Sequence, residues 1–198
     1  MKPLEPKDPI APGRLRYDSD TLLAVSWGLA EATLFFIVPD VLLTRIAILR
    51  GWRRALRACG WALAGAIVGG TLVYYAAASG HAAGLARWFD WLPGIGPALM
   101  AQAHDGLEDH GVSVLFRGAF SGIPFKLYAM HAGAMHLGWG MFLLASVGSR
   151  LARFVATSLF AWALAKTVLR ACSQAYLQAI HVAVWVAFYA VYFIRVGG

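Results

Sequence analysis

The stretch "EATLFFIVPD" at residues 31–40 interrupts an apolar region that is otherwise typical of a membrane span. It begins with Glu31 and ends with Pro39 and Asp40. A helix that only crosses a bilayer would not carry these residues, because ionisable side chains are costly in hydrocarbon and proline breaks the helix. Non-helical backbone at membrane depth is tolerated where it is buried in protein or lines a water-filled cavity. The sequence therefore predicts a hairpin over residues 21–49, broken near Pro39.

The composition of the whole chain is that of an integral membrane protein. Of its 198 residues, 60% are hydrophobic and 14% are charged, and the mean hydropathy is +0.62. Soluble domains have about a quarter of their residues charged. Apolar runs of roughly 20 residues, the length of a membrane-spanning helix, recur along the chain, and the alternation of transmembrane β-strands is absent. We therefore expect an all-α membrane protein.

Apolar and polar segments alternate along the chain and predict its organisation. After a polar, proline-rich leader without the features of a signal peptide, we expect one membrane domain over 21–170 and a final helix. The predicted segments are the leader over 1–20, the hairpin over 21–49, a basic linker over 50–57, a helix over 58–80, an extramembrane segment over 81–110, a second hairpin over 111–136, a helix over 137–169 and a C-terminal transmembrane helix over 171–198.

The placement of basic residues supports the two hairpins. Arg14 and Arg16 precede the first apolar region and the arginines of 50–57 follow it, so both flanks are cytoplasmic only if the region enters and returns. The region 111–136, which contains "FRGAFSGIPFK", would enter from the opposite side. Two opposed re-entrant hairpins with about three spanning helices are similar to the inverted repeats of secondary transporters, whose sites lie near the bilayer midplane.

Six of the ionisable residues within the predicted membrane domain are the candidate site. They are the carboxylates Glu31 and Asp40 and the cations Arg117, Lys126, Arg150 and Arg153. Arg150 and Arg153 are spaced to share one helix face. Because cations outnumber carboxylates, and arginine binds phosphate or carboxylate through paired hydrogen bonds, the set suits an anionic ligand. The structural alternative is that each carboxylate caps a helix or pairs with a nearby arginine.

Other candidate residues give weaker signals. We expect His131 and His136 to be interior histidines with satisfied hydrogen bonds. His104 and Glu108 in "HDGLEDH" have a spacing that suits a bound cation, although an exposed polar surface is the simpler interpretation. The common hydrolase, ATPase and metal-enzyme motifs are missing and nothing nominates a nucleophile. We therefore expect a protein that is not an enzyme and has no metal or cofactor.

Two further features concern partners. The spacing of Gly65 and Gly69 in "GAIVG" suits close helix packing, either in a homodimer or within one subunit. The net charge of +7 does not require nucleic acid as a partner, because topology and anionic membrane lipids explain the arginines of 50–57.

Two longer stretches resemble the DedA family, which carries the VTT or SNARE-associated domain. They are "GWRRALRACGWALAGAIVGGTLVYYAAASG" and "LFRGAFSGIPFKLYAMHAGAMHLGWGMFLLASVGSRLARF", and the resemblance covers roughly residues 25–165. It implies two opposed re-entrant hairpins in a bacterial inner-membrane protein. It also implies that Glu31 and Asp40 match the family's essential carboxylates and that Arg117 and Lys126 match its second-hairpin cations. Lys126 replaces the more usual arginine and lies further from Arg117 than in that family.

The resemblance also implies a function. Family members are implicated in returning undecaprenyl phosphate across the membrane, in envelope homeostasis and in proton-dependent stress tolerance, and eukaryotic relatives are lipid scramblases. We therefore expect a flippase-like transporter in which the cations hold a lipid phosphate headgroup and the carboxylates gate the site or couple it to protons. The alternatives are a proton- or cation-coupled transporter of a small solute, a phospholipid scramblase, or a structural protein of the membrane.

Overall fold

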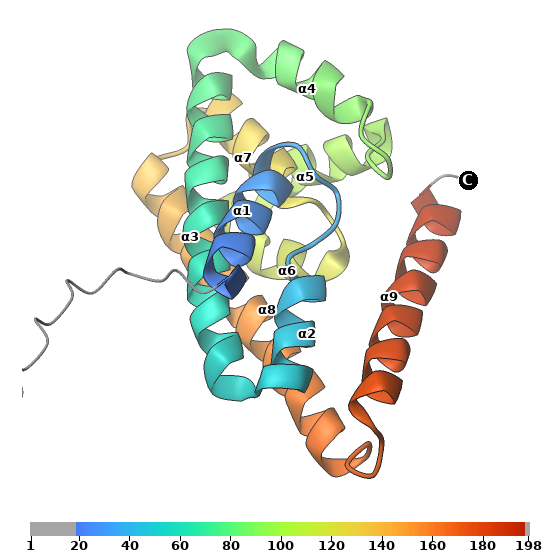
Figure 1. Ribbon diagram of the computed structural model, residues 1–198. Coiled ribbons are helices and arrows are strands. Elements are labelled where there is room, and N and C mark those ends of the chain that lie inside the picture. Colours follow the sequence, from blue (N-terminus) through green and yellow to red (C-terminus); the bar gives the residue numbers. More distant parts are fainter. Residues whose placement is uncertain (1–18, 197–198) are drawn as a thin grey trace, which may run out of the picture.

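The computed structural model describes residues 19–196. Residues 1–18 of the leader predicted over 1–20 lie outside the described residues. This part of the chain folds into helices joined by short turns, and no strand occurs within it (Figure 1). The helices are α1 (Ser19–Thr33), α2 (Asp40–Arg50), α3 (Trp52–Ala76), α4 (Ala82–Asp90), α5 (Pro97–His110), α6 (Val114–Ser121), α7 (Phe125–Ala134), α8 (Trp139–Thr167) and α9 (Gln174–Val196), with a π-helical turn at Ala77–His81 and a 3-10 turn at Gly111–Ser113.

Among the described residues, three helical stretches are long and apolar enough to cross a membrane. They are Trp52–Asp90, Trp139–Thr167 and Gln174–Ile194. The expected fold class, an all-α membrane protein, is confirmed by the helical structure of the described residues and by these three stretches. The segment predicted to be extramembrane, 81–110, contains α4 and α5, which are joined by a turn within "WLPGIGP" at residues 91–97.

The basic segment over 50–57 is not the linker that the sequence predicted. The chain turns at Gly51, whose φ of 89° favours glycine, and α3 begins immediately afterwards at Trp52. Arginine is a good helix former: Arg50 ends α2, and Arg53, Arg54 and Arg57 are exposed on α3, so their charges remain solvated within helices. The helix predicted over 58–80 therefore begins earlier.

The predicted helix break near Pro39 is present. α1 ends at Thr33 and α2 begins at Asp40, and the connection between them is not helical. Trp27 donates a hydrogen bond from its indole N–H to the backbone carbonyl of Ile37 at 2.9 Å. This bond satisfies one of the backbone acceptors that the break leaves without a helical partner.

A second break separates α6 from α7. Gly122 has a φ of 87°, in the left-handed region that favours glycine, and Pro124 immediately precedes α7. The two breaks lie next to each other in space, because Lys126 in the first turn of α7 donates from Nζ to the backbone carbonyl of Phe35 at 2.6 Å. Segments far apart in the sequence therefore meet inside the bundle.

The closest helix contact is between α1 and α3. Gly65 lies directly against the backbone of Val25, and Gly69 lies against Ala32, so the two helices run in the same direction. Only glycine permits such an approach, because a Cβ at Gly65 would meet the Val25 carbonyl oxygen. Gly65 and Gly69 therefore pack against a helix of the same chain, which is one of the two interpretations that their spacing allowed. A homodimer stays a prediction.

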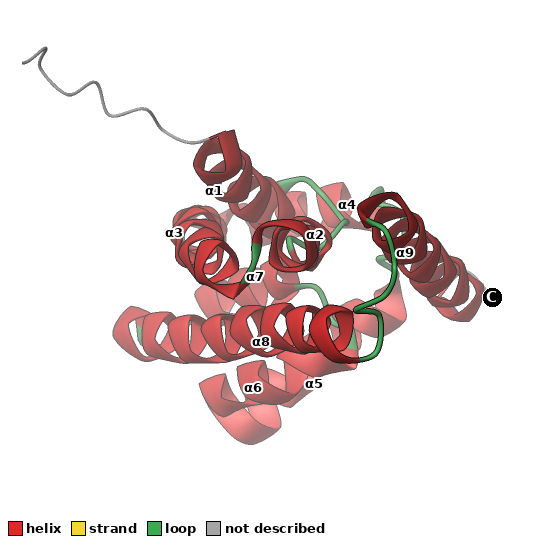
Figure 2. Cartoon of the chain, turned by 60° about the horizontal axis from the view of Figure 1, so that its bottom comes forward, coloured by secondary structure: helices red, strands yellow, loops and turns green. Residues whose placement is uncertain are grey.

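Helix α8 runs antiparallel to α3. Phe142 near the start of α8 stacks on Tyr74 near the end of α3, with ring centroids 5.3 Å apart. Further along α8, the carbonyl of Phe154 accepts a hydrogen bond from Cys59 Sγ at 3.5 Å. The middle of α8 is thereby held beside the two helix breaks, whereas α9 stands at the side of the bundle (Figures 1 and 2).

The close approach of α1 and α3 predicts opposite effects at two glycines of α3. Gly65→Ala should lower the free energy of unfolding by about 1–3 kcal/mol, because the added methyl group forces two backbones apart. Gly60→Ala should be neutral or stabilise by up to about 1 kcal/mol, since no atom lies within 4 Å of its added Cβ and alanine favours the helix. Thermal unfolding in detergent measures both, and equal effects would contradict the packing described here.

Candidate functional site

Five of the six predicted site residues lie together in the interior, where the two breaks meet the middle of α8. Glu31 is 4% exposed, Asp40 1%, Lys126 0% and Arg150 7%, and Arg153 lies at the edge with 20% of its side chain exposed. We call these five residues the buried charge cluster. Charges removed from water to this extent need partners, because an unpaired charge in the interior is very costly.

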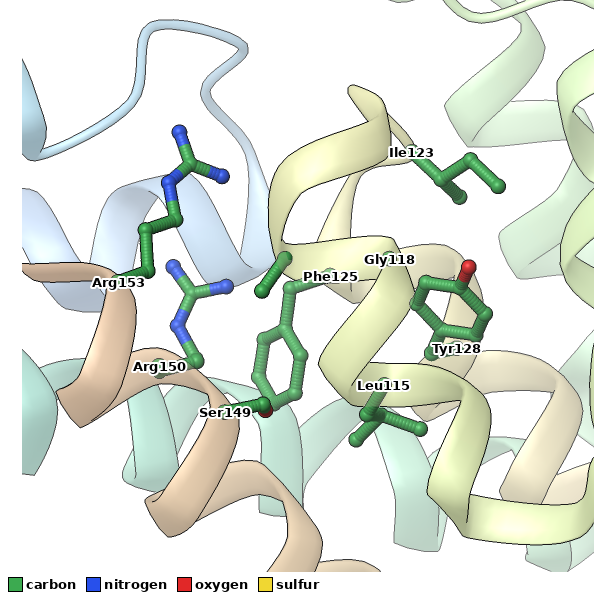
Figure 3. A pocket seen from close by; sticks show the side chains of 9 residues that line it. Leu115, Gly118, Ile123, Phe125, Tyr128, Ser149, Arg150 and Arg153 are labelled. Carbon is green, nitrogen blue, oxygen red and sulfur yellow. The ribbon is translucent and has the colours of Figure 1, made fainter.

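Glu31, at the end of α1, forms an ion pair with Arg150 of α8. The guanidinium of Arg150 also lies over the ring of Phe125, 4.4 Å from its centroid, and 5.1 Å from that of Phe154 (Figure 3). Both contacts are of the cation–π type. Nε of Arg150 is buried and has no hydrogen-bond partner among the described residues. The pair therefore joins the first helix break to α8 and leaves one donor free.

Asp40, in the first turn of α2, forms the second ion pair of the cluster. Its Oδ2 lies 3.1 Å from Arg153 on α8, and its Oδ1 accepts a hydrogen bond from the Thr157 hydroxyl at 2.8 Å. The start of a helix favours a carboxylate, because the backbone dipoles leave partial positive charge there. Arg150 and Arg153 project from one face of α8, as their spacing predicted, and each holds one carboxylate (Figure 3).

Lys126 differs from the two arginines because it has no carboxylate within ion-pair distance in the described part of the chain. Its Nζ donates to the carbonyl of Phe35 at 2.6 Å and lies 5.8 Å from the ring centroid of Phe89. An ammonium group has three donors, so the Phe35 carbonyl satisfies only part of its capacity. Lys126 is the excess positive charge of the cluster.

A small cavity lies between the two breaks, in contact with this charge. It has a volume of about 50 Å³ and is lined by Glu31, Lys126, Arg153 and Tyr189 together with apolar residues of both breaks. A single water needs about 10–15 Å³ of such space. The cavity is therefore large enough for several waters or a small oxyanion, and cationic side chains from α7 and α8 line it.

The structure does not bring Arg117 into this cluster. The residue lies on α6, where its side chain is exposed, whereas Gly118 next to it packs under the ring of Tyr128. The orientation of α6 about its own axis explains why Arg117 is exposed, because placing Gly118 against α7 turns the Arg117 side chain away from the cluster. The sequence-based placement of Arg117 beside Lys126 is corrected here; three cations, not four, accompany the two carboxylates among the described residues.

Sequence reasoning missed Thr157 and Tyr189. The hydroxyl of Tyr189 on α9 accepts a hydrogen bond from the backbone N–H of Val38 at 2.9 Å, which ties α9 to the first break. Tyrosine is common both at membrane interfaces and in protein interiors, so its presence in the last apolar segment does not indicate a site. Thr157, four positions after Arg153, was the better clue, because that spacing places it on the arginine face of α8.

The histidine candidates lie away from the cluster. His131 is partly buried in α7 and its ring centroid is 5.2 Å from that of His104 on α5, but its Nε2 has no hydrogen-bond partner among the described residues. His136 is exposed, so the expectation of interior histidines with satisfied hydrogen bonds is wrong for both residues. His104 Nε2 lies 3.8 Å from a carboxylate oxygen of Glu108, and both side chains are exposed, as the interpretation of a polar surface expects. A cation role for this group stays a prediction.

Comparison with known proteins identifies relatives in two bacteria. An uncharacterized protein of Haemophilus influenzae is 31% identical over 149 residues, which cover 70% of this chain and 73% of the relative. An uncharacterized protein of Histophilus somni is 41% identical over 56 residues, which cover 28% of this chain and 29% of that protein. No family model matches the chain, and no solved structure matches it. Its function is therefore inferred from the geometry.

The buried ion pairs predict strong and non-additive effects on stability. Glu31→Gln should lower the free energy of unfolding by about 3–5 kcal/mol, because it leaves the buried charge of Arg150 without its partner. Adding Arg150→Met should restore part of that loss, so the double variant is less destabilised than the sum of the two single variants.

The ion pair of Asp20 with Arg50 provides the control, because 43% of the Arg50 side chain is exposed. Asp20→Asn should cost about 1 kcal/mol or less. Denaturant unfolding in detergent compares the four variants. A Glu31→Gln variant that is no less stable than Asp20→Asn would show that the Glu31 pair is not buried in the protein.

Proposed function

The chain belongs to the family of the Haemophilus influenzae protein, and we propose that it transports a phosphorylated membrane lipid across the bacterial inner membrane. The observation that carries this proposal is the excess cation Lys126, which is fully buried beside a cavity and hydrogen-bonded only to a neutral carbonyl among the described residues. A buried charge of this kind is stabilised when an anion binds next to it.

The proposal includes two re-entrant hairpins, α1–α2 and α6–α7, that enter the membrane from opposite sides. Three observations support it. The outer ends of α1 and α2 lie together, where Asp20 pairs with Arg50. Both pairs are interrupted at a proline. The two interruptions meet in the interior, at the bond from Lys126 to Phe35. Opposed entry places this meeting point near the bilayer midplane, where sites of inverted-repeat transporters lie.

In the proposed mechanism the phosphate headgroup binds between the hairpin tips. Lys126 and Arg153 both line the cavity there, and the free Nε of Arg150 lies nearby on α8. A phosphate offers several acceptor oxygens, so it can bind the unused donors of Lys126 and form paired hydrogen bonds with Arg153. The lipid tail remains in the bilayer, so the protein shelters only the headgroup.

The carboxylates gate this site. Arg153 is the more exposed arginine, and its partner Asp40 keeps a second bond, from Thr157. When Arg153 turns to the phosphate, Asp40 loses its counter-ion and takes up a proton, because an unpaired carboxylate is unstable in a site of low dielectric constant. Release of the phosphate restores the Asp40–Arg153 pair and returns the proton. Glu31, which is held by Arg150, has the same role at the end of α1, on the other arm of this hairpin.

The resemblance to the DedA family suggests which phosphorylated lipid is transported. The positions that carry it, Glu31, Asp40 and Lys126, belong to the buried charge cluster, whereas Arg117 does not. On this basis we propose undecaprenyl phosphate as the lipid.

Reconstitution into liposomes tests the proposed function. The protein is supplied with a polyprenyl phosphate in one leaflet, with and without a pH gradient, and appearance of the lipid in the other leaflet is measured. Lys126→Met should reduce transport at least about tenfold, because charged hydrogen bonds contribute about 1.5–3 kcal/mol. Lys166→Met is the matched control, since Lys166 is exposed at the end of α8. Arg117→Ala should have a much smaller effect than Lys126→Met.

Three outcomes would contradict the proposal. If Lys126→Met transports as the wild-type protein does, the phosphate does not bind at the hairpin tips. If ordinary phospholipids move equally well without a gradient, the protein is a scramblase. If a folded wild-type protein moves neither lipid, a small-solute transporter replaces the proposed function.

A further inference from the structure

A second, larger cavity opens beside the buried charge cluster, between α6 and α9. Its volume is about 730 Å³. The C-terminal part of α6 forms one wall with Ala119 and Phe120, and α9 forms the other with Val184, Phe188 and Val191. We call this cavity the lateral groove. Its size is in the range of pockets that hold whole small molecules, about 300–1,000 Å³.

The floor of the lateral groove is polar, whereas its walls are apolar. Asp40 and Arg153 of the buried charge cluster form the floor together with Thr157. Arg153 also lines the small cavity between the helix breaks, so the groove leads directly to the site proposed for the phosphate. A soluble anion would not need apolar walls, and a lipid without charge would not need Arg153. The combination fits an amphiphile with an anionic head and an apolar tail.

The walls are not covered by other parts of the described chain. Phe120 is 66% exposed, Val184 60% and Val191 53%. Val184 and Val191 lie on α9, which is apolar and long enough to cross a membrane, so in a bilayer these two side chains would face hydrocarbon. In that setting the groove would open sideways to the bilayer along α9.

The attachment of α9 explains why the groove stays open. α9 is bound on the side of the first helix pair, where Trp185 donates from Nε1 to the Thr44 hydroxyl at 3.2 Å and Tyr189 accepts from the Val38 N–H at 2.9 Å. Near its end, the hydroxyl of Tyr192 donates to the carbonyl of Gly94 at 2.8 Å. These bonds fix α9 against α2 and the loop after α4, and leave its face toward α6 free.

We propose that the lateral groove holds the first part of the tail of the transported lipid, and that the lipid enters sideways between α6 and α9. This inference rests on the proposed function. The headgroup then reaches Arg153 without leaving the membrane, and the tail follows along α9. Entry through the groove requires small side chains in its lining, as Ala119 and Ala187 provide.

Photolabelling combined with transport tests this route. The probe is a long-chain polyprenyl phosphate with a diazirine in the first part of its tail, and the same molecule without phosphate is its control. In the wild-type protein the phosphate probe should label groove residues such as Phe120 and Phe188 more than Val186, which is 63% exposed on α9 but does not line the groove.

Variants that fill the groove provide the second measurement. Ala187→Trp, and independently Ala119→Trp from the opposite wall, should each reduce transport and groove labelling at least about tenfold, because the indole occupies the space of the tail. Ala190→Trp is the matched control, since Ala190 is exposed on α9 outside the groove. Thermal unfolding confirms that the variants are folded.

The outcomes separate this inference from the proposed function. If the wild-type protein transports the lipid but the probe labels Val186 as strongly as Phe188, or the probe without phosphate labels the groove equally, the route is wrong and the function stands. Wild-type transport rates in both groove variants would also overturn the route. If the wild-type protein does not transport the lipid at all, the proposed function fails, and this inference fails with it.

Discussion

Pairing of buried charges is the constraint on which the rest of the structure depends. Carboxylates within an apolar bundle are acceptable only with a cation at contact distance, and α8 supplies Arg150 for Glu31 and Arg153 for Asp40. Since Glu31 and Asp40 flank the break between α1 and α2, the two pairs anchor that break to α8. The glycine contacts between α1 and α3 then hold the helix pair α1–α2 close to the rest of the bundle.

This constraint also explains how such a core would work. If charge pairing served stability alone, an apolar core of the same shape would do as well or better, because buried ion pairs often contribute little net stability. The cluster instead keeps one cation more than it has carboxylates, and that cation, Lys126, lies where the two helix breaks meet. A bound anion would complete the pairing. Binding and release of a phosphate would then change which partner each cation has, which is the property that a gated site needs.

Much of the organisation was predictable because it follows from local chemistry. Proline and charge in apolar runs predicted both helix breaks, and the spacing of Arg150 and Arg153 predicted their shared face. The position of Arg117 was not predictable, because a short helix can rotate and the packing of Gly118 against Tyr128 decides which face is turned inward. The roles of Thr157 and Tyr189 depend on contacts between segments far apart in the chain, and no local pattern specifies those. The arginines after Gly51 were misplaced because positive charge suggests a loop although arginine favours helices.

The central claim is that the buried charge cluster binds a lipid phosphate, and native mass spectrometry of the protein purified from the membrane of a bacterial expression host tests it most directly. The wild-type protein should retain a phosphorylated polyprenyl lipid in a one-to-one complex, and Lys126→Met, purified in the same way, should not. A folded wild-type protein that retains only bulk phospholipids, or a Lys126→Met variant that retains the polyprenyl phosphate equally well, would contradict the account.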